Sequence, residues 1–190
     1  MNKDKKLLVL DCFGLFAGDP FVTYFLRHFG KESMPIKNKY CEPADKGLIT
    51  FEELMDGIER ELHVDRVEMM KELREIGKPI PEMMAWAKKM KEKHQVVLLS
   101  NCMDRMMNII FDGTEFFSCF DETYLSYKLG LVKPYEAIYK KLLDEHKEYE
   151  MSLFIDDNPA NLVEAERLGM KTILYTGFND MVKKAEALGY

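Results

Sequence analysis

Residues 152–175, SLFIDDNPANLVEAERLGMKTILY, contain a strand, a helix and a second strand in one run of chain. The apolar runs at 152–155 and 171–175 suit strands buried on both faces, as in parallel sheets covered by helices. Between them, Pro159 stands near the start of the expected helix and Gly169 lies just past its end, the usual punctuation of a helix. The stretch therefore predicts a strand–helix–strand unit of a parallel sheet.

Further strands and helices outside this stretch extend the same sheet. Short apolar runs predict buried strands at 6–10 and 95–99, and a weaker strand at 122–126. Helices are expected at 134–145 and 179–188. Because strands and helices alternate through the C-terminal half of the chain, we expect an α/β fold with a doubly wound, Rossmann-like parallel sheet.

Residues 20 to about 93 interrupt this alternation, because they contain no convincing strand. Helices are expected at 20–29, after the capping box Thr50–Glu53, after Asp65 and at 81–93. We therefore expect an α/β core made of residues 1–17 and 94–190, with residues 18–93 inserted as a small helical cap. The last cap helix, at about 80–93, would lead the chain back into the core.

The composition excludes several classes of partner. The 190 residues carry 27 Lys and Arg against 33 Asp and Glu, a net charge of −6, which argues against nucleic acid and against an anionic membrane. No apolar run approaches the roughly 20 residues that cross a bilayer, and the run after the basic N-terminus is too short for a signal peptide. Four cysteines without disulfide or CxxC spacing indicate a reduced, cytoplasmic protein. The oligomeric state stays open.

Polar residues follow the predicted strands where each one ends. They are Asp11, Ser100, Asn101, Asp156 and Asp157. In an open α/β sheet these positions meet at one edge, where ligands bind, and Lys133 can join them from the start of the next helix. Three carboxylates in one crevice repel one another and need a cation. Oxygen ligands in that number suit Mg²⁺, which favours a phosphate as a further ligand.

This set of residues suits phosphate chemistry. Ser100, Asn101 and Lys133 could hold phosphate oxygens, while a carboxylate can attack phosphorus and form an aspartyl phosphate. The cation and the lysine would offset the charges that otherwise keep two anions apart. Taken singly, each residue could equally be a turn residue or a helix cap, as Asp157 could be for the helix that follows it. Their joint placement after different strands favours a site.

Four short motifs also occur in order along the chain: LVLDCFGLF at 8–16, LLSN at 98–101, GLVKP at 130–134 and FIDDNPAN at 154–161. Together they resemble the haloacid dehalogenase-like (HAD) hydrolase superfamily, in the branch with a helical cap after the first strand. The resemblance spans essentially the whole chain. It implies Asp11 as the nucleophile and Ser100 and Lys133 as phosphate holders. It also implies Mg²⁺ bound by Asp11, the backbone carbonyl of Phe13, Asp156 and Asp157.

One position departs from the family pattern. Phosphatases of the family usually carry a second Asp two residues after the nucleophile, which protonates the leaving group, and this chain has Phe13 there. General acid–base help is typically worth about 10²–10⁴ in rate, so acyl and glycosyl phosphates, whose leaving groups need little protonation, would suffer less than alkyl phosphates.

Three functions therefore stay open. The first is a Mg²⁺-dependent phosphatase of a small phosphorylated metabolite. The second is a 2-haloacid dehalogenase, in which an aromatic residue at this position is usual. The third is an inactive protein that binds a phosphorylated compound. The Asp156–Asp157 pair favours the phosphatase, because dehalogenases of the family lack a metal, and Asp11 argues against the inactive binder.

Substrate choice should depend on the cap, which would close over the crevice and exclude water. Arg105 lies about one turn beyond Asn101 in the sequence and is a candidate substrate contact, although it could equally be a surface residue. The sequence does not identify the metabolite.

Overall fold

The computed structural model of the protein describes residues 6–190, and the core of the molecule is a parallel sheet of five strands in the order β3-β2-β1-β4-β5. The strands are β1 (Leu7–Leu10), β2 (Gln95–Ser100), β3 (Glu122–Leu125), β4 (Ser152–Asp156) and β5 (Lys171–Leu174). All neighbouring pairs are parallel. The chain builds outward from β1 to β2 and β3, then crosses back to add β4 and β5 on the other side. The predicted doubly wound sheet is confirmed.

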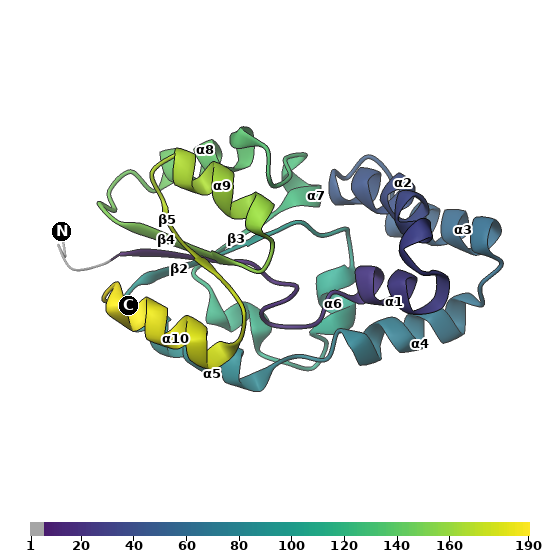
Figure 1. Cartoon of the computed structure of the whole chain (residues 1–190), viewed down its shortest axis with the longest axis horizontal. Helices are drawn as coiled ribbons and strands as arrows, with labels where there is room; N and C mark the ends of the chain where they lie inside the picture. Colours follow the sequence, from purple (N-terminus) through teal and green to yellow (C-terminus); the bar gives the residue numbers. More distant parts are fainter. Residues whose placement is uncertain (1–5) are drawn as a thin grey trace.

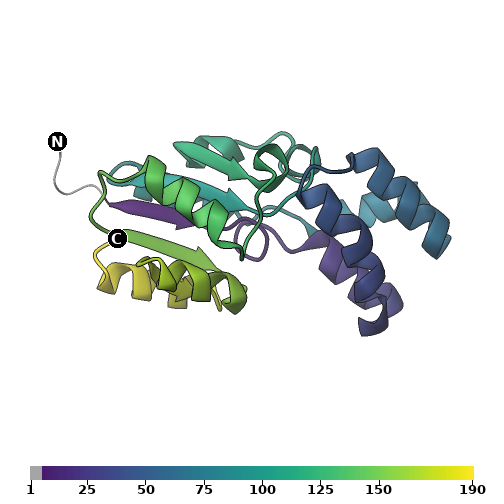
Figure 2. The ribbon, with the colours of Figure 1, turned by 90° about the horizontal axis from the view of Figure 1, so that it is seen from above.

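β1 shows why the sheet is covered on both faces. All four of its side chains are fully buried; Leu8 and Leu10 join one apolar cluster, and Leu7 and Val9 join another on the opposite face. Helices cover each face: α5 (Pro81–Lys91) and α10 (Phe178–Ala187) pack against the first cluster, and α8 (Glu136–Glu145) and α9 (Pro159–Arg167) against the second. Figure 1 shows the three layers, and Figure 2 shows the strands of the sheet side by side.

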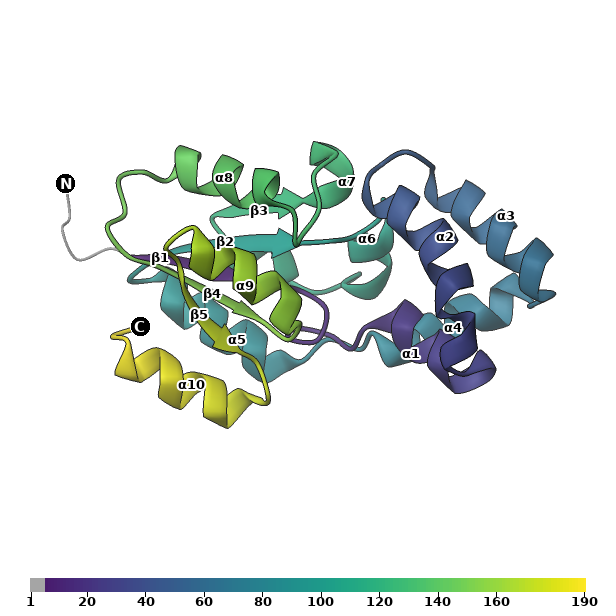
Figure 3. The same cartoon turned by 45° about the horizontal axis from the view of Figure 1, so that its top comes forward.

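Four helices lie beyond the carboxyl ends of the strands, at the right of Figure 3. They are α1 (Pro20–Phe29), α2 (Met34–Asp45), α3 (Phe51–Leu62) and α4 (Arg66–Ile76). α3 begins with the expected capping box: the Thr50 hydroxyl accepts a hydrogen bond from the backbone N–H of Glu53, and the Glu53 carboxylate accepts one from the backbone N–H of Thr50. Asp65 caps α4 through the backbone N–H of Glu68. Within residues 6–190, no helix is long and apolar enough to cross a membrane.

Shorter elements complete the chain: η1 (Lys31–Ser33), α6 (Met106–Ile110), η2 (Phe116–Cys119) and α7 (Ser126–Leu129). All four cysteines are free and buried.

α2 is the one long helix that the sequence patterns do not predict. Pro35 lies in its first turn and Pro43 lies inside it, and few of its residues are apolar. Packing holds it in place: Cys41 is buried, and Gly57 of α3 lies so close to the Tyr40 ring that any side chain at position 57 would overlap the ring. Tertiary contacts here outweigh a weak local preference for helix.

Candidate active site

Asp11 and Asp156 lie at the carboxyl ends of β1 and β4, the two neighbouring strands from which the chain continues toward opposite sides of the sheet. Asp11 directly follows β1, and Asp156 ends the neighbouring strand β4. The backbone N–H of Asp11 donates to the carbonyl of Ile155 at 3.0 Å, which fixes the two strand ends side by side. The chain leaves β1 toward one half of the sheet and β4 toward the other, so a crevice opens between the two connections. Ligands of open α/β sheets bind in such crevices.

Lys133 joins these two carboxylates. Its Nζ lies 2.7 Å from Asp11 Oδ1 and 2.7 Å from Asp156 Oδ2, and only 1% of its side chain is exposed. Burial opposes the charge of Lys133, but the two carboxylates outweigh it and raise the pKa of the ammonium. Burial also raises the pKa of Asp11, against the lowering effect of Lys133. The three groups therefore form one buried ion cluster with a cation at its centre.

Asp157 completes the acidic set. Oxygen atoms of Asp11, Asp156 and Asp157 lie within 4.8 Å of one another. The Asp157 carboxyl group reaches this position because Gly14 has no side chain: a Cβ there would overlap it, and the φ of +90° at Gly14 also favours glycine. Three carboxylates and one ammonium leave a formal charge of −2. Hard oxygen donors with that charge fit a divalent cation such as Mg²⁺.

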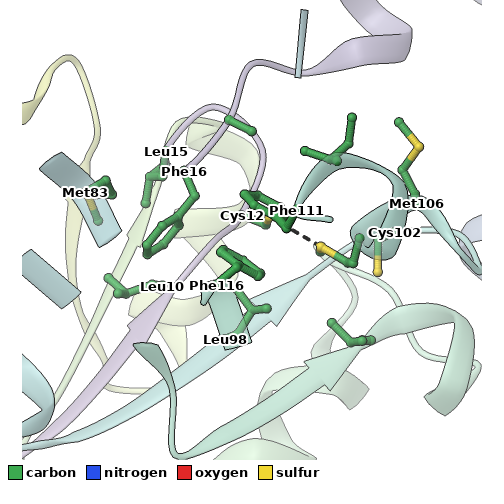
Figure 4. Close-up of a cluster of buried hydrophobic side chains, with 14 of the residues drawn as sticks. Leu10, Cys12, Leu15, Phe16, Met83, Leu98, Cys102, Met106, Phe111 and Phe116 are labelled. Atoms are coloured by element: carbon green, nitrogen blue, oxygen red, sulfur yellow. Dashed lines mark hydrogen bonds between the residues drawn. The ribbon is translucent and has the colours of Figure 1, made fainter. Parts of the chain in front are cut away.

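The loop that carries Phe13 is anchored in the core. Backbone hydrogen bonds from Gly14 to Ala17 (2.7 Å) and from Phe16 to Cys12 (2.8 Å) fold the loop tightly. Figure 4 shows Phe16 pointing into the apolar cluster, where its ring meets Phe116 edge-on at 5.4 Å between centroids. This packing fixes the backbone at Phe13, whose carbonyl is the predicted metal ligand. The half-buried Phe13 ring itself offers neither a proton nor a base.

Ser100 and Asn101 are both at the crevice, but in different roles. Ser100 ends β2, is fully buried and donates its hydroxyl to its neighbour's carbonyl at 3.3 Å. The Asn101 side chain binds the backbone of Lys133 twice: Nδ2 donates to the Lys133 carbonyl at 2.9 Å, and Oδ1 accepts from the Lys133 N–H at 2.8 Å. In the structure the Asn101 amide positions Lys133, and the binding of substrate by Asn101 stays a prediction.

Asn161, the last residue of the FIDDNPAN motif, is a site residue outside the predicted metal and phosphate ligands. Its Nδ2 donates to both oxygens of Asp156, at 3.1 and 2.9 Å, and the side chain is buried. The backbone N–H of Asn158 adds a third hydrogen bond to Asp156, at 2.7 Å. Asp156 is therefore held on every side. The signal was present in the sequence, since a residue in the first turn of α9 can point back toward the end of β4.

Arg105 is not brought to the carboxylates. Its Nη1 donates to Glu52 Oε1 of α3 at 2.7 Å, and 56% of its side chain is exposed. Among residues 6–190, its ion pair is with Glu52 and not with Asp11 or Asp156. Arg105 thus connects the segment after β2 to the outer helices, and the structure gives it no contact with the predicted site.

Comparison with known proteins bears on the fold. No family model matches the chain. A HAD-like family hydrolase from Porphyromonas gingivalis is 21% identical, with a TM-score of 0.78 over 97% of this chain and 98% of that one. A HAD family enzyme from Bacteroides thetaiotaomicron, crystallised with magnesium and inorganic phosphate, is 24% identical, with a TM-score of 0.72 over 89% and 93%. The chain has the HAD fold.

A third structure with the HAD fold is that of an enzyme with a different reaction. The L-2-haloacid dehalogenase from Xanthobacter autotrophicus, solved with chloropropionic acid covalently bound, is 14% identical, with a TM-score of 0.59 over 88% of this chain and 76% of that one. Enzymes with this fold therefore include both a phosphate binder and a dehalogenase. The fold alone therefore does not select a chemistry, and that choice depends on the site residues.

Proposed function

We propose that the protein is a Mg²⁺-dependent phosphohydrolase that acts on a small phosphorylated metabolite through an aspartyl phosphate on Asp11. The observation that carries this proposal is the buried cluster of Asp11, Lys133 and Asp156, completed by Asp157. Its formal charge of −2 suits a divalent cation, and Lys133 offers an ammonium next to the nucleophile. The Bacteroides enzyme with the same fold, crystallised with magnesium and phosphate, supports the assignment.

In this proposal Asp11, the Phe13 carbonyl, Asp156 and Asp157 hold the Mg²⁺, which would neutralise phosphate charge and so let two anions meet. An Asp11 oxygen attacks phosphorus, and the bond from phosphorus to the leaving-group oxygen breaks. Lys133 and the Ser100 hydroxyl hold the phosphoryl oxygens during the transfer. Water then attacks phosphorus, inorganic phosphate leaves, and the Asp11 carboxylate is restored.

Two further expectations belong to this proposal. Residues 18–93 would act as a cap over a core of residues 1–17 and 94–190 and exclude water from the aspartyl phosphate. The position of α1–α4 beyond the strand ends supports this role (Figure 3). Four free, buried cysteines support a cytoplasmic location, where thiols stay reduced.

A 2-haloacid dehalogenase is the second candidate, favoured by one observation. Phe13 provides no acid, and halide needs no proton to leave. Against this candidate, a dehalogenase has no use for a cluster of three carboxylates that demands a cation. Chloride release from 2-chloropropionate, without any phosphate release, would decide for the dehalogenase.

The proposal is tested with a panel of phosphorylated metabolites in the presence of Mg²⁺. Wild type should release phosphate from at least one compound, and both EDTA and the Asp11→Asn substitution should abolish the release. Asp65→Asn is a matched control, because Asp65 caps α4 far from the cluster in sequence and Asn is an equally good cap. Activity that survives EDTA would refute the metal assignment, and activity that survives Asp11→Asn would refute the nucleophile.

A further inference from the structure

A small cavity of about 50 Å³ lies where the core meets the outer helices. Phe13 and Asn101 line it from the core, next in sequence to the Asp11 loop and to Ser100. Three charged residues line it from the other side: Asp19, Lys37 and Asp45. The cavity therefore adjoins the one place where the site lacks an acid, beside the Phe13 ring.

The two carboxyl groups of this cavity differ in what they already do. Asp19 Oδ1 accepts a hydrogen bond from the backbone N–H of Val22 at 2.9 Å and so caps α1. Among the described residues, the Asp45 carboxyl group accepts no hydrogen bond and has no ion pair. Asp19 is thus occupied with a structural task, while within residues 6–190 the Asp45 carboxyl group has neither a hydrogen bond nor an ion pair.

Burial raises the pKa of Asp45 to about 7, against the lowering effect of Lys37. Asp19 and Glu42 add to the rise by repulsion. The other titratable neighbours are the thiols of Cys41 and Cys102, which burial keeps neutral by raising their pKa. With such a pKa, about half of Asp45 carries a proton at neutral pH, which suits a group that gives and takes protons.

Asp45 is also held at a fixed place relative to the core. It is the last residue of α2, and Gly47 follows in a left-handed conformation, with φ +67°. Gly47 lies against the backbone carbonyl of Tyr127 in α7, so closely that a side chain at position 47 would overlap it. The end of α2 is therefore docked on α7, which follows β3 at the same edge of the sheet as the carboxylate cluster.

We infer that Asp45 supplies the leaving group with the proton that Phe13 cannot supply. The inference rests on the proposed phosphohydrolase function. As the bond from phosphorus to the leaving-group oxygen breaks, its electron pair stays on that oxygen, which takes the proton of Asp45, while phosphorus bonds to Asp11. The Asp45 carboxylate then accepts a proton from the water that attacks phosphorus, and the acid is restored.

The same cavity limits the substrate. A water molecule needs about 10–15 Å³ of such a cavity, so about 50 Å³ has room for only a few water-sized groups of a substrate. With a proton donor in this cavity, poor leaving groups such as alkoxides become acceptable. The inference therefore assigns phosphate monoesters of small alcohols to the substrate class, beside the acyl and glycosyl phosphates that need no acid.

The test compares wild type with Asp45→Asn on 4-nitrophenyl, phenyl and ethyl phosphate, in the order of increasing leaving-group pKa. We expect kcat/KM for ethyl phosphate to fall by about 10²–10⁴ in Asp45→Asn, and that for 4-nitrophenyl phosphate to change by less than about threefold. Asp19→Asn is the matched control: it removes the other carboxyl group of the cavity but keeps the cap of α1, because Asn caps helices as well as Asp. Its dependence on the leaving group should equal that of wild type.

A pH profile gives a second readout that a structural role would not move. For ethyl phosphate, kcat/KM of wild type should fall as the pH rises above about 7, because the acid form of Asp45 is lost. This fall should vanish in Asp45→Asn and move to higher pH in Lys37→Gln, since Lys37 lowers the pKa of Asp45.

The possible results distinguish a failure of the role of Asp45 from a failure of the proposed phosphohydrolase function. An unchanged leaving-group dependence in Asp45→Asn, with Asp11→Asn still inactive, would overturn only the role of Asp45. So would a steeper dependence in Asp19→Asn than in Asp45→Asn, or an equal loss on all three esters. Full activity of Asp11→Asn, or no phosphate release by wild type from any of the esters or from any compound of the metabolite panel, would overturn the proposed function and this inference together.

Discussion

Replacing Lys133 with Met should leave Asp11 and Asp156 as two buried carboxylates without the ammonium that pairs with both. Lys133, Asp156 and Asp11 have side chains that are 1%, 0% and 10% exposed, so solvent screens their charges little. Each contact of 2.7 Å corresponds to about 6 kcal/mol of attraction at an effective dielectric constant of about 20. The desolvation of three ions offsets much of this, and breaking such a buried pair typically costs about 3–5 kcal/mol.

The assay is urea unfolding of wild type and Lys133→Met in EDTA at pH 7.5. We expect the free energy of unfolding to fall by about 3–5 kcal/mol, a large part of the 5–15 kcal/mol typical of a domain. Lys147→Met is the matched control, because Lys147 forms an ion pair with Asp144 at 3.0 Å but is 74% exposed. Its loss should cost less than about 1 kcal/mol.

The stability of the Lys133→Met variant should change with pH in a direction that follows from the pKa of Asp11. Burial already raises the pKa of Asp11 in the folded protein, and loss of Lys133 removes an effect that lowers it. The folded variant then binds protons more readily than its unfolded chain, so its stability should recover as the pH falls from 7.5 to 5.5. Mg²⁺ should stabilise the variant more than wild type, because the charge of the site becomes more negative.

Two results would refute this reasoning. A loss below about 1 kcal/mol, equal to that of Lys147→Met, would mean that the Lys133 contacts are screened like surface ion pairs. Stability of Lys133→Met that falls further at pH 5.5 would mean that the two carboxylates are not what destabilises it.

Three other substitutions test the remaining parts of the site and fold. Gly14→Ala should weaken Mg²⁺ binding by about 10–100-fold in calorimetry, because the new methyl group displaces the Asp157 carboxyl group; unchanged binding would remove Asp157 from the metal site. Asn161→Ala should weaken Mg²⁺ binding to a similar degree, because Asp156 loses two hydrogen bonds, and equal affinity in both proteins would contradict its positioning role. Thr50→Ala should lower the stability by about 0.5–2 kcal/mol through loss of the capping box and leave Mg²⁺ affinity unchanged.

Much of the fold follows from local signals in the sequence. Most of the strands follow short apolar runs bounded by turn residues, and β3 (Glu122–Leu125) is the weaker exception. The helices at Pro20, Thr50, Asp65 and Pro159 begin with capping residues or prolines that can be recognised without a structure. Each of these signals involves residues only a few positions apart, so it can be recognised in a single sequence without knowledge of tertiary contacts. α2 has only Pro35 in its first turn as such a signal, and Pro43 inside it argues against a helix, so α2 depends on its contacts with α1 and α3.

For the candidate site, the sequence predicts which residues meet but not how their side chains are oriented. The rule that ligands bind at the ends of parallel strands is enough to place Asp11, Asp156 and Lys133 together, and the structure does so. The orientation of side chains could not be predicted. Asn101 turns its amide to the backbone of Lys133, and Arg105 turns away to Glu52, because partners distant in sequence compete for each polar group.

Because β1 lies at the centre of the sheet, the protein can complete this sheet only late in its synthesis on the ribosome. β1 is synthesised early, yet its two neighbours are Gln95–Ser100 and Ser152–Asp156, with Leu7 paired to Gln95 and to Ser152. Contacts this distant form slowly and only after most of the chain has emerged. Until then the nascent chain carries Asp11 without Lys133 or Asp156. The ion cluster can therefore form only after β4 has been synthesised, and a chain interrupted before β4 lacks both Asp156 and Asp157.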